Sequence, residues 1–202
     1  MLWSILIPTL HSRKEKFERL KNEIFRQVYQ AQLRGMDDIY GNVEVLSEPN
    51  GGDMLVGYYR NILLNRSRAK YVSYFDDDDW PHKDYVESIY LCLRFVPDPD
   101  VVTFKGEVNF NGTNTKKIVM SARTTAYMLT ENTFHWPPTH LCVARRAIAE
   151  KYLFNETVRL GSDKERALAM VRDNAFRKDR EVFIDKRLYF YNYDSTKNQK
   201  KV

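Results

Sequence analysis

The sequence predicts an α/β fold, with a mostly parallel mixed sheet flanked by helices. Two observations carry this prediction. Short apolar runs alternate with amphipathic stretches over the first 105 residues, and turn-forming Pro, Gly, Asn or Asp residues separate them. This alternation is typical of βαβ units, in which successive strands lie parallel and a helix connects them. Ligands of such sheets bind beyond the carboxyl ends of the strands.

The first half of the chain has the regular strand–helix pattern. Its apolar runs predict four strands, over residues 4–10, 42–49, 71–75 and 101–106. A helix over 13–32 follows the capping-box pair Ser12 and Glu15, because its apolar residues recur at helical spacing. The same spacing predicts two further helices, over residues 55–69 and 82–95.

The second half has a different pattern. Asn111-Gly112 is a strong hairpin signal. Short helices are expected over 144–154 and 161–176, and a closing strand pair over 180–194. We therefore expect a single domain over residues 1–202, composed of a first half over 1–105, a smaller lobe over 106–194 and a frayed basic tail over 195–202.

The composition indicates the compartment of the protein and the charge of the partners that it can bind. The net charge of +5 permits an anionic partner without requiring one. The two cysteines, Cys92 and Cys142, are far apart in sequence, which favours a reducing compartment and predicts a cytoplasmic location. No apolar run approaches the roughly 18 residues of a membrane span, so we expect no stable membrane anchor.

Four consecutive aspartates, Asp76 to Asp79, follow the apolar run 71–75. Carboxylates held this close raise one another's pKa unless a cation neutralises them. Because alternate side chains of a strand share a face, Asp76 and Asp78 are expected to converge. Mg²⁺ and Mn²⁺ bind one or two carboxylates and complete their shell with water and phosphate oxygens. The run predicts a metal that bridges a diphosphate to the protein, and a solvated acidic turn that caps the next helix is the alternative.

Five segments also carry a family resemblance over nearly the whole chain: SILIPTLHSRKEKFERL, VGYYRNILLNRSRAKYVSYFDDDDW, PPTHL, GSDKERAL and VFIDKRLYFYNY. They resemble glycosyltransferase family 2, and most closely its small members, some of which are phage-encoded. The resemblance implies the Rossmann-like GT-A fold, a nucleotide-sugar donor, a divalent metal and inversion at the anomeric carbon. It makes 1–105 the donor half and 106–194 the acceptor and catalytic half.

The resemblance also assigns roles to individual residues. Asp163 matches the second residue of the family's Glu-Asp pair, the usual catalytic base, although Ser162 stands where glutamate is common. Asp78, together with Asp76 or Asp79, would hold the metal. The residues that would bind the donor are Pro8, Thr9, Glu48, Arg60, Asn61, Asp76 and Asp77.

Four further residues are candidates for contacts with the diphosphate or the acceptor. His140 is the first of them, and a structural histidine is the alternative reading of it. Trp136 and Trp80 are candidates for stacking on a sugar or base, and Glu165 is the reserve base. Within the aspartate run, Asp77 is expected to tolerate change best.

The implied function is transfer of a hexosyl or pentosyl group, most simply from a UDP-sugar, with Mn²⁺ or Mg²⁺ as the metal. The implied acceptor is a glycan or a modified DNA base, which would have to be exposed or flipped. Two alternatives stay open. One is a nucleotidyltransferase, although IPTLHSRKEK contains no glycine-rich phosphate loop. The other is a non-catalytic relative that binds a nucleotide sugar and a metal.

Overall fold

The computed structural model describes residues 1–112 and 114–193. Its strands are β1 (Trp3–Leu10), β2 (Val43–Asn50), β3 (Tyr71–Tyr74), β4 (Trp80–Pro81), β5 (Val101–Phe110), β6 (Asn114–Met120), β7 (Met128–Thr130), β8 (Thr133–Trp136), β9 (Val143–Arg145) and β10 (Glu181–Tyr193). Its α-helices are α1 (Lys14–Leu33), α2 (Val56–Arg66), α3 (Tyr85–Phe95), α4 (Arg146–Ala149) and α5 (Ser162–Arg172). The expected tail over 195–202 lies outside the described residues.

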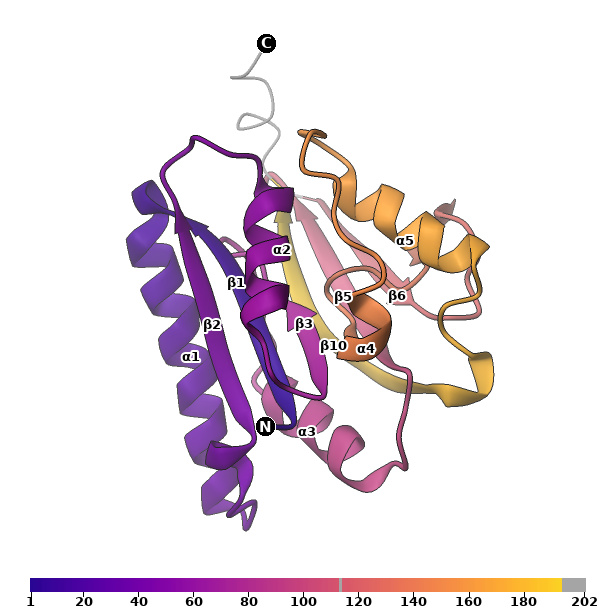
Figure 1. Cartoon of the computed structure of the whole chain (residues 1–202). Helices are drawn as coiled ribbons and strands as arrows, with labels where there is room; N and C mark the ends of the chain where they lie inside the picture. Colours follow the sequence, from indigo (N-terminus) through magenta and orange to yellow (C-terminus); the bar gives the residue numbers. More distant parts are fainter. Residues whose placement is uncertain (113, 194–202) are drawn as a thin grey trace.

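All ten strands of the described residues form one mixed sheet, in the order β2-β1-β3-β9-β5-β6-β8-β7 (Figure 1). β10 pairs with β5 and β4 off this path. β1 is parallel to both β2 and β3, as the strand–helix alternation predicts, whereas β9 runs antiparallel to β3 and β5. The carboxyl ends of β1, β2 and β3 therefore meet at one edge of the sheet, at the top of Figure 1.

Alternation along β1 distributes the core over the two faces of the sheet. Trp3, Ile5 and Ile7 are fully buried and pack with the apolar residues of α1 and α3. Leu6 points to the other face and packs with α2. Each such side chain contributes roughly 1.5–3 kcal/mol of hydrophobic free energy when it is buried. A run that is apolar on both faces is what a central strand covered by helices on both sides requires.

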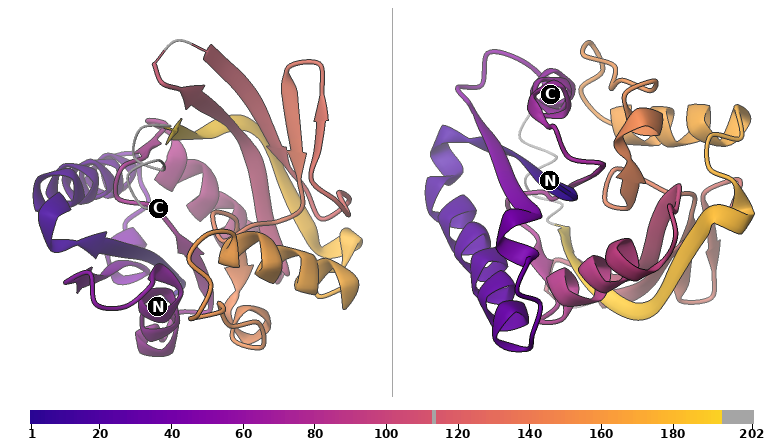
Figure 2. Two further views of the ribbon diagram at one scale, coloured as in Figure 1. Left: turned by 90° about the horizontal axis from the view of Figure 1, so that it is seen from above. Right: turned by 60° about the horizontal axis from the view of Figure 1, so that its bottom comes forward.

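The expected boundary between residues 105 and 106 falls inside β5, which runs on to Phe110 (Figure 2). The hairpin at Asn111-Gly112 is confirmed: β5 and β6 are antiparallel, and Asn111 and Gly112, which follow the paired residue Phe110, both have positive φ angles (52° and 78°). The expected closing strand pair is wrong. β10 is one long strand whose pairing with β5 shifts register between Ile184 and Tyr189, so the polar residues inside it mark an irregularity rather than a turn.

Both cysteines are free, as expected. Among residues 1–112 and 114–193, no helix combines the length and the apolar character that a membrane crossing would need.

Helix α2 lies unusually close to the segment that connects α4 to α5. A Cβ atom added at Gly57 would lie 2.6 Å from the carbonyl oxygen of Asn155, closer than real Cβ contacts allow. Asn61, one turn further along α2, holds the same segment. Its amide donates to the carbonyl of Phe154 (3.0 Å), and its Oδ1 accepts from the Phe154 N–H (2.9 Å). Gly57 and Asn61 thus form a clamp between α2 and this segment.

We expect the Gly57→Ala substitution to destabilise the protein. Replacing a helical glycine by alanine normally gains about 0.5–1 kcal/mol, but forcing an extra methyl against a fixed backbone costs about 1–3 kcal/mol. The net loss should be about 1–2 kcal/mol and should lower the midpoint of urea unfolding. Gly41→Ala is the matched control, because no atom lies within 4 Å of its added Cβ. Equal stability of the two variants would contradict the clamp.

Candidate active site

The aspartate run lies in the turn between β3 and β4, and its members divide into two kinds. Asp77 and Asp79 are buried, with 4% and 3% of their surface exposed, whereas Asp76 and Asp78 are half-buried. Exposure thus alternates along the run, although the run lies in a turn rather than on a strand as expected. The turn places two carboxylates where a ligand can reach them and two where it cannot.

The buried carboxylates anchor the turn. Asp77 accepts hydrogen bonds from Thr9 Oγ1 (2.7 Å) and Arg13 Nη1 (2.8 Å). Asp79 accepts from the Tyr189 hydroxyl and from the Asn192 backbone N–H (2.8 Å). These bonds tie the turn to the ends of β1 and β10. These bonds argue against the expectation that Asp77 tolerates change best, because without Asp77 the buried Thr9 hydroxyl would lose its charged acceptor and Arg13 would lose one of its two carboxylate partners.

Asp76 belongs to a buried network with Arg60 and His140. Arg60 Nη2 donates to Asp76 Oδ1 (2.8 Å) and lies 3.1 Å from His140 Nε2, which in turn lies 3.4 Å from Asp76 Oδ2. Burial alone would raise the pKa of Asp76, but Arg60 and His140 outweigh it and hold that pKa below its ordinary value. Asp76 is therefore a stable anion.

His140 also reaches the expected catalytic base. Its Nδ1 lies 3.9 Å from Asp163 Oδ2, and Asp163 occupies the first turn of α5. When Nε2 accepts from Arg60, the ring proton must be on Nδ1, where it faces Asp163. The structure thus brings together Arg60, Asp76, His140 and Asp163, which come from α2, the turn after β3, the segment before β9, and α5.

Two further contacts fix these groups in place. The Tyr74 N–H donates to the His140 carbonyl (2.9 Å), so the end of β3 holds the histidine backbone. Arg166, three residues after Asp163 on α5, is buried and donates to the Tyr152 carbonyl (2.6 Å). Burial lowers the pKa of Arg166 to about 10, but the guanidinium stays charged at neutral pH. Arg166 therefore anchors the start of α5 and with it Asp163.

The residues present suit a divalent cation that shares its shell with a diphosphate. Burial, and then the charge of Asp76, raise the pKa of Asp79 well above its ordinary value. No three His, Cys, Asp or Glu side chains gather as a metal cage within the described ranges. Two accessible carboxylates, Asp76 and Asp78, are nevertheless the number that Mg²⁺ or Mn²⁺ commonly takes when phosphate oxygens supply other ligands.

Buried donors near these carboxylates also suit a phosphate ligand. Arg60 Nε and His140 Nδ1 are buried and make no hydrogen bond to any residue that the structure describes. Buried polar atoms without a partner are costly, and a ligand oxygen is one way to satisfy them.

The other expected donor contacts lie at the same edge of the sheet. Pro8 of β1 is paired with Glu48 of β2, and Thr9 follows it. Glu48 forms an ion pair with Arg66 of α2, so its side chain lies on the same side of the sheet as Arg60. These residues surround the carboxyl ends of the parallel strands.

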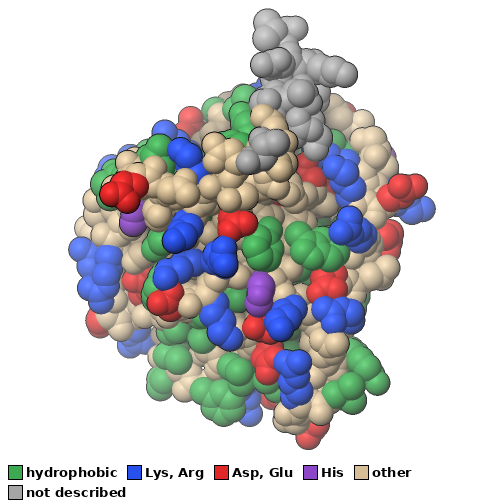
Figure 3. Space-filling model, turned by 180° about the vertical axis from the view of Figure 1, so that it is seen from behind, with side chains coloured by type: hydrophobic (Ala, Val, Ile, Leu, Met, Phe, Trp, Pro, Cys, Tyr) green, Lys and Arg blue, Asp and Glu red, His purple; other side chains and the backbone are tan. Residues whose placement is uncertain are grey.

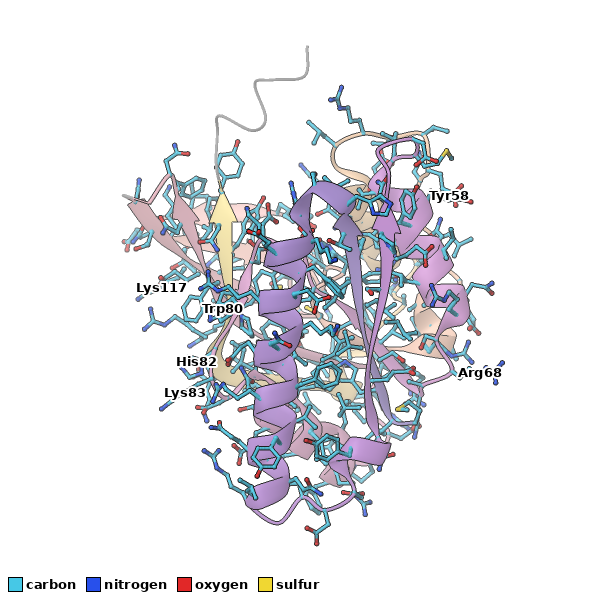
Figure 4. The ribbon with its side chains drawn as sticks, turned by 90° about the vertical axis from the view of Figure 1, so that its left-hand side faces the viewer. Tyr58, Arg68, Trp80, His82, Lys83 and Lys117 are labelled. Carbon is cyan, nitrogen blue, oxygen red and sulfur yellow. The ribbon has the colours of Figure 1, made fainter. Side chains whose placement is uncertain are left out.

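Two expected site residues lie elsewhere. Asn61 faces the Phe154 backbone rather than Asp76, because the clamp uses both ends of its amide. Trp80 faces α1, where the Arg19 guanidinium stacks 4.4 Å from its ring centroid (Figure 4). The reserve base Glu165 is exposed and accepts a hydrogen bond from Asn155 (3.4 Å).

Several residues at the site were not expected from the sequence. Arg13 bridges Asp77 and Asp78, at 2.8 and 3.1 Å, and so neutralises part of the run. Tyr189 binds Asp79, and Tyr191 lies close to the aspartates. Burial, followed by the charges of Asp79, Asp76, Asp163 and Asp78, raises the pKa of the Tyr191 hydroxyl. The period-two spacing of tyrosines in LYFYNY was the available signal.

Known structures share this fold. No protein-family model and no curated protein sequence matches the chain. The crystal structure of S. aureus TarS residues 1–349 matches 95% of the chain with a TM-score of 0.62 and 19% identity. The same TarS fragment in complex with UDP-GlcNAc matches 96% of the chain (TM-score 0.62, 15% identity), and its complex with UDP also matches 96% (TM-score 0.57, 16% identity).

The chain spans about 60% of the length of these TarS fragments. It spans 37% of a longer TarS structure, which it matches with a TM-score of 0.58. The fold of this chain, a mixed α/β sheet of the GT-A type, is therefore confirmed over nearly its whole length.

Replacing Asp77 by Asn should destabilise the protein by about 1–3 kcal/mol, because the buried Thr9 hydroxyl and the half-buried Arg13 guanidinium lose a charged acceptor. Asp78→Asn in the same turn is the control and should cost less, because Asp78 is half-buried. Urea unfolding of the two variants measures the difference. A smaller loss for Asp77→Asn than for Asp78→Asn would show that Asp77 does not anchor the turn.

Proposed function

We propose that this protein is a metal-dependent inverting glycosyltransferase that transfers a sugar from a UDP-sugar to an acceptor hydroxyl. The observation that carries the proposal is the position of His140, which lies between Asp76 of the aspartate run and Asp163 at the start of α5. This position supports a donor site and a general base that are adjacent, as transfer requires. The shared fold with TarS, which has been crystallised with UDP-GlcNAc and UDP, supports the same class of donor.

In the proposed complex, Pro8, Thr9 and Glu48 border the nucleoside, and Arg60 faces the diphosphate. The forked guanidinium of Arg60 suits phosphate oxygens. Asp78 and Asp76 would hold Mn²⁺ or Mg²⁺, with Asp79 supporting the turn from below. The metal would supply positive charge where negative charge develops on the departing diphosphate.

Asp163 acts as the general base in this proposal. The acceptor oxygen attacks the anomeric carbon while the bond from that carbon to the diphosphate oxygen breaks, and the bonding electrons leave with the nucleoside diphosphate. Asp163 accepts the proton of the acceptor hydroxyl. Attack from the side opposite to the diphosphate inverts the anomeric centre. In this proposal His140, whose Nδ1 lies 3.9 Å from Asp163 Oδ2, helps to orient that carboxylate.

The two alternatives yield different products. A nucleotidyltransferase would release pyrophosphate, a glycosyltransferase releases nucleoside diphosphate, and a non-catalytic binder releases neither. The observation that favours the binder is Ser162, which is buried at the position where the family commonly has glutamate.

We expect Asp163→Asn to lower transfer by roughly 10²–10⁴-fold, the usual contribution of a positioned base. Donor affinity should stay within about twofold of wild type, because the side chain keeps its size and lies on the acceptor side. Nucleoside diphosphate release and donor titration by calorimetry measure the two effects. Full transfer activity in this variant would exclude Asp163 as the base.

Donor binding should depend on the metal. We expect one nucleotide sugar of a panel to raise the melting temperature in the presence of Mn²⁺, as any ligand of the native state does. Removing the metal with EDTA, or replacing Asp78 by Asn, should abolish this shift. Equal stabilisation with and without metal would contradict the metal-binding role of the aspartate run.

A further inference from the structure

The ring of Phe154 is surrounded by buried residues of the candidate active site. Phe154 belongs to the segment that connects α4 to α5, and only 2% of its surface is exposed. The guanidinium carbons of Arg60 and Arg166 lie 5.1 and 4.6 Å from the centroid of its ring. The rings of Tyr74 and His140 lie edge-on to it, with centroids 5.2 and 6.3 Å away. One aromatic side chain thus packs against two buried cations and two other rings.

The two cations beside this ring have few anionic partners. Arg60 has one carboxylate, that of Asp76, at 2.8 Å. Arg166 donates to the carbonyl oxygens of Tyr152 and Ala149, and it forms no ion pair with any residue that the structure describes. Cations on the surface are solvated and lie among carboxylates, as the mixed Lys, Arg, Asp and Glu side chains of the face in Figure 3 show. Attraction between a cation and an aromatic face is stronger when the cation is desolvated. The ring therefore supplies electrostatic attraction to two buried cations that share a single carboxylate.

Hydrogen bonds alone do not fix the plane of the Arg60 guanidinium. Its contacts with Asp76 (2.8 Å) and His140 (3.1 Å) both involve Nη2. Its Nε is buried and has no hydrogen-bond partner within the described part of the chain. A guanidinium attached at one nitrogen can still rotate about that nitrogen. The ring of Phe154 restricts this rotation, because it is a flat surface against which the guanidinium packs.

Phe154 can support Arg60 because its own backbone is fixed. The side-chain amide of Asn61 bonds both the N–H (2.9 Å) and the carbonyl (3.0 Å) of Phe154. Gly57 lets α2 approach the next residue, Asn155, closely. Since Asn61 directly follows Arg60 on α2, the helix that carries the cation also holds the ring beside which the cation lies.

We propose that Phe154 is a positioning residue for sugar transfer, and that its ring holds Arg60 in the orientation that binds the diphosphate of the donor. Phe154 is too buried to touch the donor and acts through Arg60. Binding groups depend on such supporting residues, because a displacement of about 1 Å removes much of their effect. This inference rests on the proposed function, and it adds a residue that neither the aspartate run nor the family resemblance indicates.

The test changes the charge of the ring face and keeps its shape. Each fluorine on an aromatic ring withdraws electron density from the face and so weakens its attraction to a cation, while the ring stays apolar. Phe154 is replaced in the full chain by phenylalanine with one, two or three ring fluorines. Affinity for the donor nucleotide sugar, which thermal shift identifies, is measured by calorimetry. We expect this affinity to fall with each fluorine, and to be about tenfold lower with three.

Phe104 of β5 is the matched control. Its ring is fully buried and lies edge-on to Tyr85, with 6.1 Å between the centroids, and no cation lies over it among the described residues. The same fluorinated series at Phe104 should leave the donor affinity unchanged. A loss that is specific to Phe154 separates the cation contact from general packing, because a purely apolar ring would give equal affinity throughout both series.

A second measurement needs no donor. The Nε–H of Arg60 is observed by NMR and is assigned by its absence in Arg60→Lys. With three fluorines at Phe154, we expect this proton to exchange with water about tenfold faster than in the wild type, because the guanidinium is held less firmly. Three fluorines at Phe104 should leave its exchange rate unchanged.

Equal donor affinity across the Phe154 series would overturn the inference, and so would an Arg60 exchange rate that three fluorines at Phe154 leave unchanged. Failure of the proposed function is a separate result, in which the wild-type protein binds no nucleotide sugar. The exchange measurement then still decides whether Phe154 holds Arg60 in place.

Discussion

The buried guanidinium of Arg60 is the contact on which the arrangement of the site depends. It is almost inaccessible to water, so it requires a carboxylate, and Asp76 supplies one at 2.8 Å. A buried charge that loses its partner is strongly destabilising, which fixes the relative positions of α2 and the turn after β3. His140 lies against both groups and extends the network to α5. The Arg60–Asp76 ion pair, extended by His140, therefore fixes how the parallel strands lie relative to the second half of the chain.

The aspartates of the run are stabilised by several different partners. Arg13 spans Asp77 and Asp78, Arg60 neutralises Asp76, and Asp79 receives hydrogen bonds from β10. Two carboxylates serve the turn and two remain accessible. Since the accessible ones alternate with the buried ones, the same four residues build the turn and present oxygen ligands on one side of it.

Local pattern predicted much of the fold and part of the site. Apolar runs and helical spacing located β1, β2, β3, β5 and the first three helices, because each depends on the burial of nearby residues. The alternation expected for a strand matches the alternating exposure of the four aspartates, although the run lies in a turn. It could not show that Asp77 is anchored, because Thr9 and Arg13 lie more than 60 positions away.

Three sequence-based assignments were wrong because a local pattern does not show which distant residues a side chain or a strand contacts. The RN pair on α2 suggested one role for two neighbours, but adjacent positions on a helix point about 100° apart, so Arg60 faces Asp76 while Asn61 faces Phe154. Trp80 follows the aspartates in sequence, yet its strand β4 is short and directs the ring to α1. The strand pair expected over 180–194 is one strand, because its pairing with β5 shifts register without ending the strand.

The continuity of β5 has a consequence for how this protein can be divided. Residues 101–110 pair with β9 and β6 on one side and with β10 on the other, so the strand belongs to both halves at once. An exchange of the second half with a relative at residue 105 would cut hydrogen-bonded strands in mid-course. A junction at Asn111-Gly112 would cut no strand, and a chimaera made there would have to supply β6, β9 and β10 strands that pair with the retained β5.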